Sequence, residues 1–237
     1  LTRLDEEIIP RNKADVFSID KTRSLFKKIR KYEKHSAQEF LFYVEKMAKW
    51  KQLLELIHPT TTIQTSEIKI SLSGTWDYPS HQDDIPIVKY DYRENNVFSY
   101  KKKKGRWCKP AFLLNIENTG KRDLWISLLY LSTNFGINNI LIPKQKLEPQ
   151  QNVSASYISG GTTKLIIPIQ LEEYYLNLGI KKIEEYLKIF ICTDEFETSQ
   201  FNQDGVPLDK AITPDERMRS LAIESVAQPD WTTIEIP

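Results

Sequence analysis

The sequence predicts a mainly β protein: an antiparallel, immunoglobulin-like β-sandwich with an N-terminal helical segment packed on it. From residue 67 onward, apolar and polar residues alternate with the period of two that is typical of strands. At least seven such short stretches follow one another, joined by turn-like sequences and without helical stretches between them, which favours a sandwich. Before residue 60 the period is that of a helix. We therefore expect a helical segment over 1–59 and a sandwich domain over 60–237.

The helical segment contains one strongly amphipathic stretch, residues 36–57. Its apolar residues recur at steps of three and four, which places them on one face that must pack against the rest of the protein. Ser36 and Glu39 form a Ser-x-x-Glu capping box at its start. A shorter basic helix is expected over 21–34, after a short strand at 15–19. The predicted packing face comprises Phe40, Tyr43, Val44, Met47, Trp50, Leu54 and Ile57.

The expected strands share alternating apolar residues and flanking turn residues. Trp50 on the helix and Trp231 in the last strand are expected to be buried core anchors. A long polar connection, residues 195–228, precedes the last strand, and we expect it to be mobile and to be the segment that moves or is cut. The strands are predicted at 68–72, 85–92, 106–117, 123–132, 138–142, 153–157, 164–171, 186–193 and 231–236.

Composition and charge restrict the class of protein. The chain is 40% hydrophobic and 27% charged, with a net charge of +1, which argues against a general polyanion binder. No apolar run approaches the ~20 residues of a membrane-spanning helix. The acidic start has no signal-peptide core and no initiator Met, which indicates an excised domain or a processing product. Two cysteines do not make a disulfide framework, so we expect a reduced, cytoplasmic setting.

Cys192 is the residue that most suggests a catalytic nucleophile, and its surroundings argue against one. A thiol nucleophile needs a base and an oxyanion hole, and no histidine stands in a suitable sequence context. Alternation within the strand places Cys192 on the same face as Lys188 and Phe190, as expected of a packed strand cysteine. Cys108 is interpreted in the same way. The histidines are His35, His58 and His81.

Metal and cofactor sites are not expected either. The histidines and cysteines show neither a paired-cysteine nor a helical His–His spacing. With only eight glycines, the chain contains no glycine-rich phosphate loop. The sequence therefore predicts no catalytic, metal-binding or cofactor-binding residue.

A run of basic residues is the best candidate for partner binding. It lies between Tyr100 and Trp107, where the pattern predicts the tip of a hairpin. With aromatic residues beside it, the run has the composition of a phosphate-binding surface. The alternative, which we favour, is a solubilising turn that protects the hairpin from edge pairing. The candidate residues are Lys101, Lys102, Lys103, Lys104, Arg106 and Trp107.

Several segments, taken in order, resemble the C-terminal accessory region of bacterial caspase-like (metacaspase-type) proteins, over roughly residues 15–237. They are VEKMAKWKQLLELIHP at 44–59, FLLNIENTG at 112–120, LWISLLYLS at 124–132, LEP at 147–149, LKIFICTDEF at 187–196 and DWTT at 230–233. The protease domain of that family, with its His and Cys, is not in this chain. The resemblance therefore implies a non-catalytic regulatory or partner-recognition module that contacts a caspase-like protease domain or another protein.

Two other classes of function remain open. The first is a nucleic-acid-binding module that uses the lysine-rich hairpin at 101–107, a less favoured alternative. The second is a stand-alone enzyme whose site assembles only on folding, although no nucleophile and base pair is visible in the sequence. A membrane partner is not expected.

Overall fold

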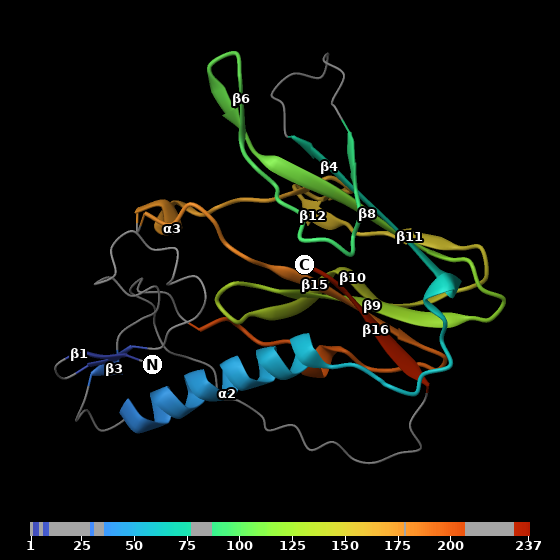
Figure 1. The fold of residues 1–237 in the computed structure, drawn as a ribbon, viewed down its shortest axis with the longest axis horizontal. Helices are drawn as coiled ribbons and strands as arrows, with labels where there is room; N and C mark the ends of the chain where they lie inside the picture. Colours follow the sequence, from blue (N-terminus) through green and yellow to red (C-terminus); the bar gives the residue numbers. More distant parts are fainter. Residues whose placement is uncertain are drawn as a thin grey trace.

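The computed structural model describes residues 36–76, 87–177, 179–206 and 230–237, together with the backbone of three short strands near the N-terminus. The protein is mainly β, with antiparallel sheets, as predicted (Figure 1). The short N-terminal strands form a sheet of their own: β1 (Thr2–Leu4), β2 (Glu7–Ile9) and β3 (Ile29–Arg30). The predicted helix over 21–34 is wrong at Ile29–Arg30, which pair with β2 as a strand. The rest of that helix and the strand expected at 15–19 lie outside the described residues.

The first large sheet, here called sheet I, has the strand order β10-β9-β15-β16. Its strands are β9 (Leu124–Leu131), β10 (Ile137–Leu147), β15 (Tyr186–Cys192) and β16 (Trp231–Ile236). All neighbours are antiparallel, and β15 pairs along its whole length with β9. The last strand of the chain therefore completes a sheet that begins more than one hundred residues earlier in the sequence.

The second large sheet, sheet II, has the order β11-β8-β4-β5, and β14 also pairs with β8. Its strands are β4 (Ile68–Trp76), β5 (Val88–Tyr90), β8 (Pro110–Asn118), β11 (Asn152–Ser154) and β14 (Ile167–Pro168). Two small hairpins extend from it along the chain: β6 (Lys101–Lys103) with β7 (Arg106–Cys108), and β12 (Tyr157–Ser159) with β13 (Thr162–Lys164). The strand predicted over 164–171 is divided: Lys164 ends β13, and Ile167–Pro168 form β14, in which Pro168 has no N–H for a ladder.

The two large sheets bury their alternating apolar residues against one another in a single core. Leu114 of β8 and Ile126 of β9 are almost completely buried there, as is Ile189 of β15. At ~25 cal/mol per Å² of apolar surface removed from water, each such side chain contributes about 1.5–3 kcal/mol. The alternating apolar residues in the sequence therefore mark the face of each strand that packs against the other sheet.

Helix α2 (Ser36–Glu55) covers the opposite face of sheet I. Leu53 packs there against Leu129, Leu131 and Phe190, so the middle of sheet I is apolar on both faces. The other helical pieces are short: α3 (Glu173–Asn177), η1 (Thr65–Glu67) and η2 (Ser199–Phe201).

The buried face of α2 is rotated from the predicted one. Val44 and Ile57 are 39% and 72% exposed, whereas Lys46 is 5% exposed. Lys46 tolerates burial because its Nζ donates to the backbone carbonyl of Asp204 at 2.6 Å and lies 4.5 Å from the centroid of the Phe42 ring. A periodic pattern treats a lysine as polar and solvent-facing. The carbonyl that offsets the cost of burying Lys46 belongs to a residue far along the chain. Trp50 and Trp231 are half-buried and do not form the fully buried anchors that we expected.

The first part of the connection predicted to be mobile, residues 195–206, is held by specific contacts. Lys49 Nζ donates to the carbonyl of Gln200 at 3.0 Å, and Gln203 donates to the carbonyls of Lys46 and Phe135. Lys144 pairs with Glu195 and Glu197 at the start of the same segment. Residues 207–228 lie outside the described part of the chain.

Candidate functional site

The lysine hairpin, β6 and β7 with the turn between them (residues 101–108), projects beyond sheet II at one end of the protein (Figure 1). Lys104 and Gly105 occupy the turn with φ of 47° and 81°, the left-handed conformation that a two-residue type I′ turn requires at both positions. A glycine there is favourable, whereas a lysine costs about 1–2 kcal/mol. The predicted hairpin is confirmed, and its tip presents Lys104 to solvent.

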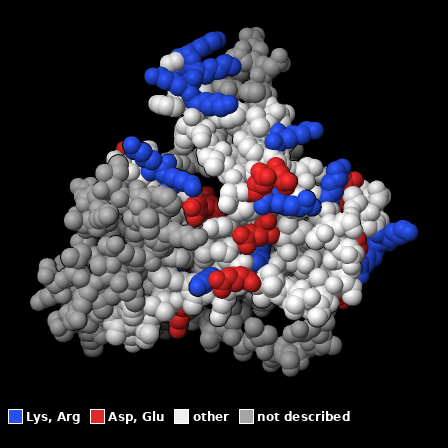
Figure 2. All heavy atoms as spheres, viewed as in Figure 1, with Lys and Arg blue, Asp and Glu red and all other residues white. Residues whose placement is uncertain are grey.

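The two faces of the hairpin differ. On one face, Cys108 is buried at the base, and Lys101 Nζ lies 3.4 Å from the centroid of the Trp76 ring. On the other face, Lys102 stands opposite Trp107, which is 68% exposed. No described carboxylate pairs with Lys102, Lys104 or Arg106. Figure 2 shows the basic side chains gathered at this end of the molecule. The hairpin is thus a positively charged projection with one exposed indole.

A cleft opens between the two large sheets and has a volume of about 920 Å³. Sheet I contributes its β9 and β10, sheet II contributes β8 and β14, and α3 closes one end. Because its walls come from both sheets, no single sequence motif encodes this inter-sheet cleft. Its lining residues are Phe112, Tyr130, Asn138, Ile140, Leu141, Ile167, Pro168, Ile169, Gln170, Glu172, Glu173, Tyr174, Asn177 and Glu185.

One end of the inter-sheet cleft is acidic. The described lining includes three glutamates and no lysine, arginine or histidine. Burial raises the pKa of the Glu185 carboxyl, and the charge of Glu172 raises it further, whereas a hydrogen bond with the Tyr130 hydroxyl lowers it. Burial also raises the pKa of Tyr130, so this hydroxyl stays protonated as a hydrogen-bond donor. The carboxyl groups of Glu172 and Glu185 therefore lie close enough to interact at this end of the cleft.

Strand β10 is irregular where it lines the cleft. Its register with β9 passes from Asn138↔Tyr130 to Ile142↔Leu128, so β10 advances four residues (142 − 138) while β9 advances two (130 − 128). The extra residues form a bulge, which turns side chains away from the regular ladder. Ile140, in this bulge, is 66% exposed. Bulges of this kind are enriched beside functional sites.

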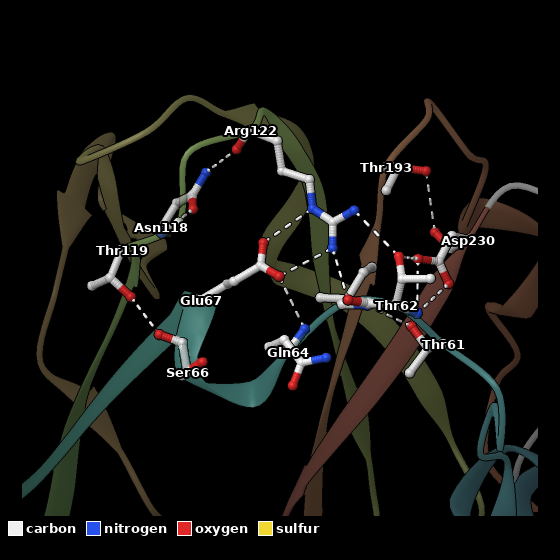
Figure 3. A network of polar contacts seen from close by, with 12 residues as sticks. Thr61, Thr62, Gln64, Ser66, Glu67, Asn118, Thr119, Arg122, Thr193 and Asp230 are labelled. Atoms are coloured by element: carbon white, nitrogen blue, oxygen red, sulfur yellow. Dashed lines mark hydrogen bonds and ion pairs between the residues drawn. The ribbon is translucent and has the colours of Figure 1, made fainter.

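A polar network joins the segment after α2 to both sheets (Figure 3). Arg122 donates to both carboxylate oxygens of Glu67, at 3.0 and 3.1 Å, and to the carbonyl of Thr62. Thr62 in turn donates through its N–H and hydroxyl to Asp230, directly before β16. Burial alone would raise the pKa of Glu67, but the hydrogen bonds from Arg122 and the Gln64 N–H lower it. We call Thr62, Glu67, Arg122 and Asp230 the Arg122 clamp, and its contacts are structural.

Asn118, at the end of β8, is fully buried beside this network. Its side-chain amide donates to the carbonyls of Arg122 at 2.8 Å and Leu147 at 2.9 Å, and its oxygen accepts from the Gly120 N–H at 3.0 Å. The asparagine fixes the turn between β8 and β9. The segment FLLNIENTG, which contributes to the family resemblance, thus consists of a core strand and the residues that end it.

The cysteines are packed strand residues, as predicted. Cys192 and Cys108 are 4% and 2% exposed, and both are free thiols. Burial raises the pKa of Cys192 to about 12, with Asp194 and Asp230 adding to the effect, so its thiolate is disfavoured at neutral pH. Lys188 shares the face of Cys192 and Phe190, and its Nζ donates to the carbonyl of Leu54 at the end of α2.

Metal-binding and membrane-spanning features were also sought in the described residues. Nowhere in them do three or more His, Cys, Asp or Glu side chains converge as metal ligands would. Their helices are too short or too polar to span a bilayer.

The structure brings the predicted hairpin residues together on one projection, but it places them away from the inter-sheet cleft. Sequence reasoning missed the cleft and the clamp. The only local signals were the Glu172–Tyr175 run and the adjacent pair Glu184 and Glu185, both beside apolar residues. Comparisons with family models, curated proteins and solved structures found no match to this chain.

Proposed function

We propose that the chain is a non-catalytic recognition module that binds a protein partner through the lysine hairpin. The observation that carries this proposal is the exposed Trp107 on a projecting hairpin, beside Lys102 and Lys104, neither of which pairs with a described carboxylate. Tryptophan is enriched among residues that dominate binding energy, and an indole that is 68% exposed has apolar area left to bury. The lysines around Trp107 attract an acidic surface of a partner toward the lysine hairpin.

The resemblance to accessory regions of bacterial caspase-like proteins makes a caspase-like protease domain the first partner to test. In that role the module regulates the protease domain if a further partner binds one arrangement of module and protease domain more tightly than the other. We also propose that sheets I and II form an immunoglobulin-like sandwich and that the module works in the cytoplasm. The shared core of the sheets supports the first statement, and two free cysteines support the second.

The test measures binding of the chain to a bacterial caspase-like protease domain by calorimetry, together with turnover of a reporter peptide. Trp107→Ala combined with Lys102→Glu should weaken binding at least about tenfold, because a central aromatic residue and its neighbouring charge are both lost. Lys121→Glu is the matched control, since Lys121 is an exposed lysine on a different turn. Equal affinity of the double variant and the control would overturn the role of the hairpin.

The same exposed indole and lysines support nucleic acid as the second candidate partner. Aromatic rings stacked on bases contribute about 1–3 kcal/mol each in single-strand binding, and lysines hold the phosphates. Anisotropy of a labelled single-stranded oligonucleotide at several salt concentrations separates this candidate from the first. Replacing Lys101, Lys102, Lys103 and Lys104 with Ser should weaken binding and flatten its salt dependence. Salt-independent or absent binding would remove nucleic acid as a partner.

A further inference from the structure

We propose that the inter-sheet cleft binds an extended segment of a partner protein and receives an arginine or lysine side chain beside Glu185. This inference rests on the proposed function in one respect, namely that the chain recognises proteins. It concerns a second surface, separate from the lysine hairpin, and it assigns the chemistry of the bound segment.

The size and lining of the cleft fit a peptide better than a single side chain. A volume of about 920 Å³ lies near the upper end of the ~300–1,000 Å³ that is typical of ligand pockets. Phe112, Leu141 and Ile167 provide apolar walls for the residues on either side of the bound cation. The exposed Ile140 extends this apolar surface to the mouth of the cleft.

The backbone around the cleft is irregular. The β10 bulge leaves residues 139–141 without Cα partners in β9. Across the cleft, β14 pairs with β8 over two residues only. Part of this backbone is already hydrogen-bonded, because the Ile140 N–H donates to Asn138 Oδ1 and the Leu141 carbonyl accepts from the Ser156 N–H. A bound segment would therefore be held in the cleft mainly through its side chains.

The negative charge of Glu185 determines which side chain of the bound segment is favoured. Glu185 is half-buried, and its hydrogen bond with the Tyr130 hydroxyl uses one of the roughly four acceptor positions of a carboxylate. Glu172 lies close enough to act electrostatically on Glu185. A guanidinium or ammonium group placed here gains attraction from the Glu185 carboxylate, and an arginine can bind this carboxylate with two parallel hydrogen bonds. A neutral or acidic side chain placed there gains no such attraction or paired hydrogen bonds, and it loses its contacts with water.

The test uses two peptides that differ in charge alone. The first is acetyl-Leu-Arg-Leu-methylamide, and the second carries citrulline, the neutral isostere, in place of arginine. Binding to the whole chain is followed by two-dimensional NMR. The arginine peptide should cause saturable shifts at Ile140, Gln170 and Tyr174, with an affinity at least about tenfold above that of the citrulline peptide. That ratio is the least expected for one charge-assisted hydrogen bond.

Two variants probe the acidic end. Glu185→Gln keeps the size and the hydrogen bond with Tyr130 but removes the charge, and it should abolish the preference for arginine. Glu172→Gln, at an exposed position, should reduce the preference by a smaller factor. Glu45→Gln, on the exposed side of α2, is the control and should leave binding unchanged.

Equal binding of the two peptides, shifts outside the cleft, or an unchanged preference in Glu185→Gln would each overturn the inference. The outcome is separable from that of the hairpin test, because the peptide assay requires neither the hairpin nor a protease domain. Arginine-dependent binding in the cleft of Trp107→Ala would support the cleft even where the hairpin proposal fails.

Discussion

Replacing Asn118 with Ala should destabilise the protein by about 3–4 kcal/mol. The substitution removes three hydrogen bonds, one buried and two partly buried, each worth about 1 kcal/mol net, and it leaves the carbonyl of the buried Leu147 without that donor. A buried acceptor without a partner costs a further ~1 kcal/mol or more, partly offset if water enters the space. Since domains of this size unfold with about 5–15 kcal/mol, the loss is a large part of the total.

Urea unfolding followed by tryptophan fluorescence measures this loss as a lower midpoint with an unchanged slope. Asn115→Ala is the matched control, because Asn115 lies on the same strand and donates to Asn152 and Ser154, but from a partly exposed position. The control should cost less than about 1 kcal/mol, since water replaces those hydrogen bonds. If Asn118→Ala costs no more than the control, the argument that burial determines the worth of these bonds is refuted.

Three further predictions follow from burial. Cys108 and Cys192 should resist a thiol reagent in the native protein and react only on unfolding; rapid labelling at neutral pH would contradict their burial. Because burial raises the pKa of Glu185 in the folded protein above the ordinary value of 4.5, the unfolded chain releases this proton first and stability falls as pH rises. Glu185→Gln should therefore gain stability relative to the unchanged protein as the pH rises above 4.5 in urea titrations, and a constant difference would refute this linkage. Trp50→Phe should cost less than ~1.5 kcal/mol, since the buried indole Nε1 has no described hydrogen-bond partner; a larger loss in the same assay would indicate a partner.

The sequence predicts what depends on local periodicity. Alternation in β15 correctly places Phe190 and Cys192 opposite Ile189 and Ile191, because a strand has only two faces and both are apolar here. The turn at Lys104 and Gly105 is likewise encoded locally. These features need no knowledge of distant residues.

Features that depend on distant residues were not predictable in this way. The rotation of α2 depends on Lys46 finding the carbonyl of Asp204, 158 residues away. The acidic end of the cleft joins Tyr130 and Glu185, which meet only because β9 and β15 are neighbours in sheet I. A polar residue that periodicity places in solvent can be buried when a distant residue supplies its hydrogen-bond partner, and periodicity alone does not identify that partner.

The packing of α2 on sheet I has a consequence for how this protein can be divided. A fragment that begins at residue 60 would leave Leu129, Leu131 and Phe190 on an open apolar face without Leu53 above them. Such a face favours self-association. Lys188 would also lose the Leu54 carbonyl that accepts its hydrogen bond. Recombination or proteolysis that separates α2 from the two sheets should therefore expose this apolar face and promote aggregation of the remainder.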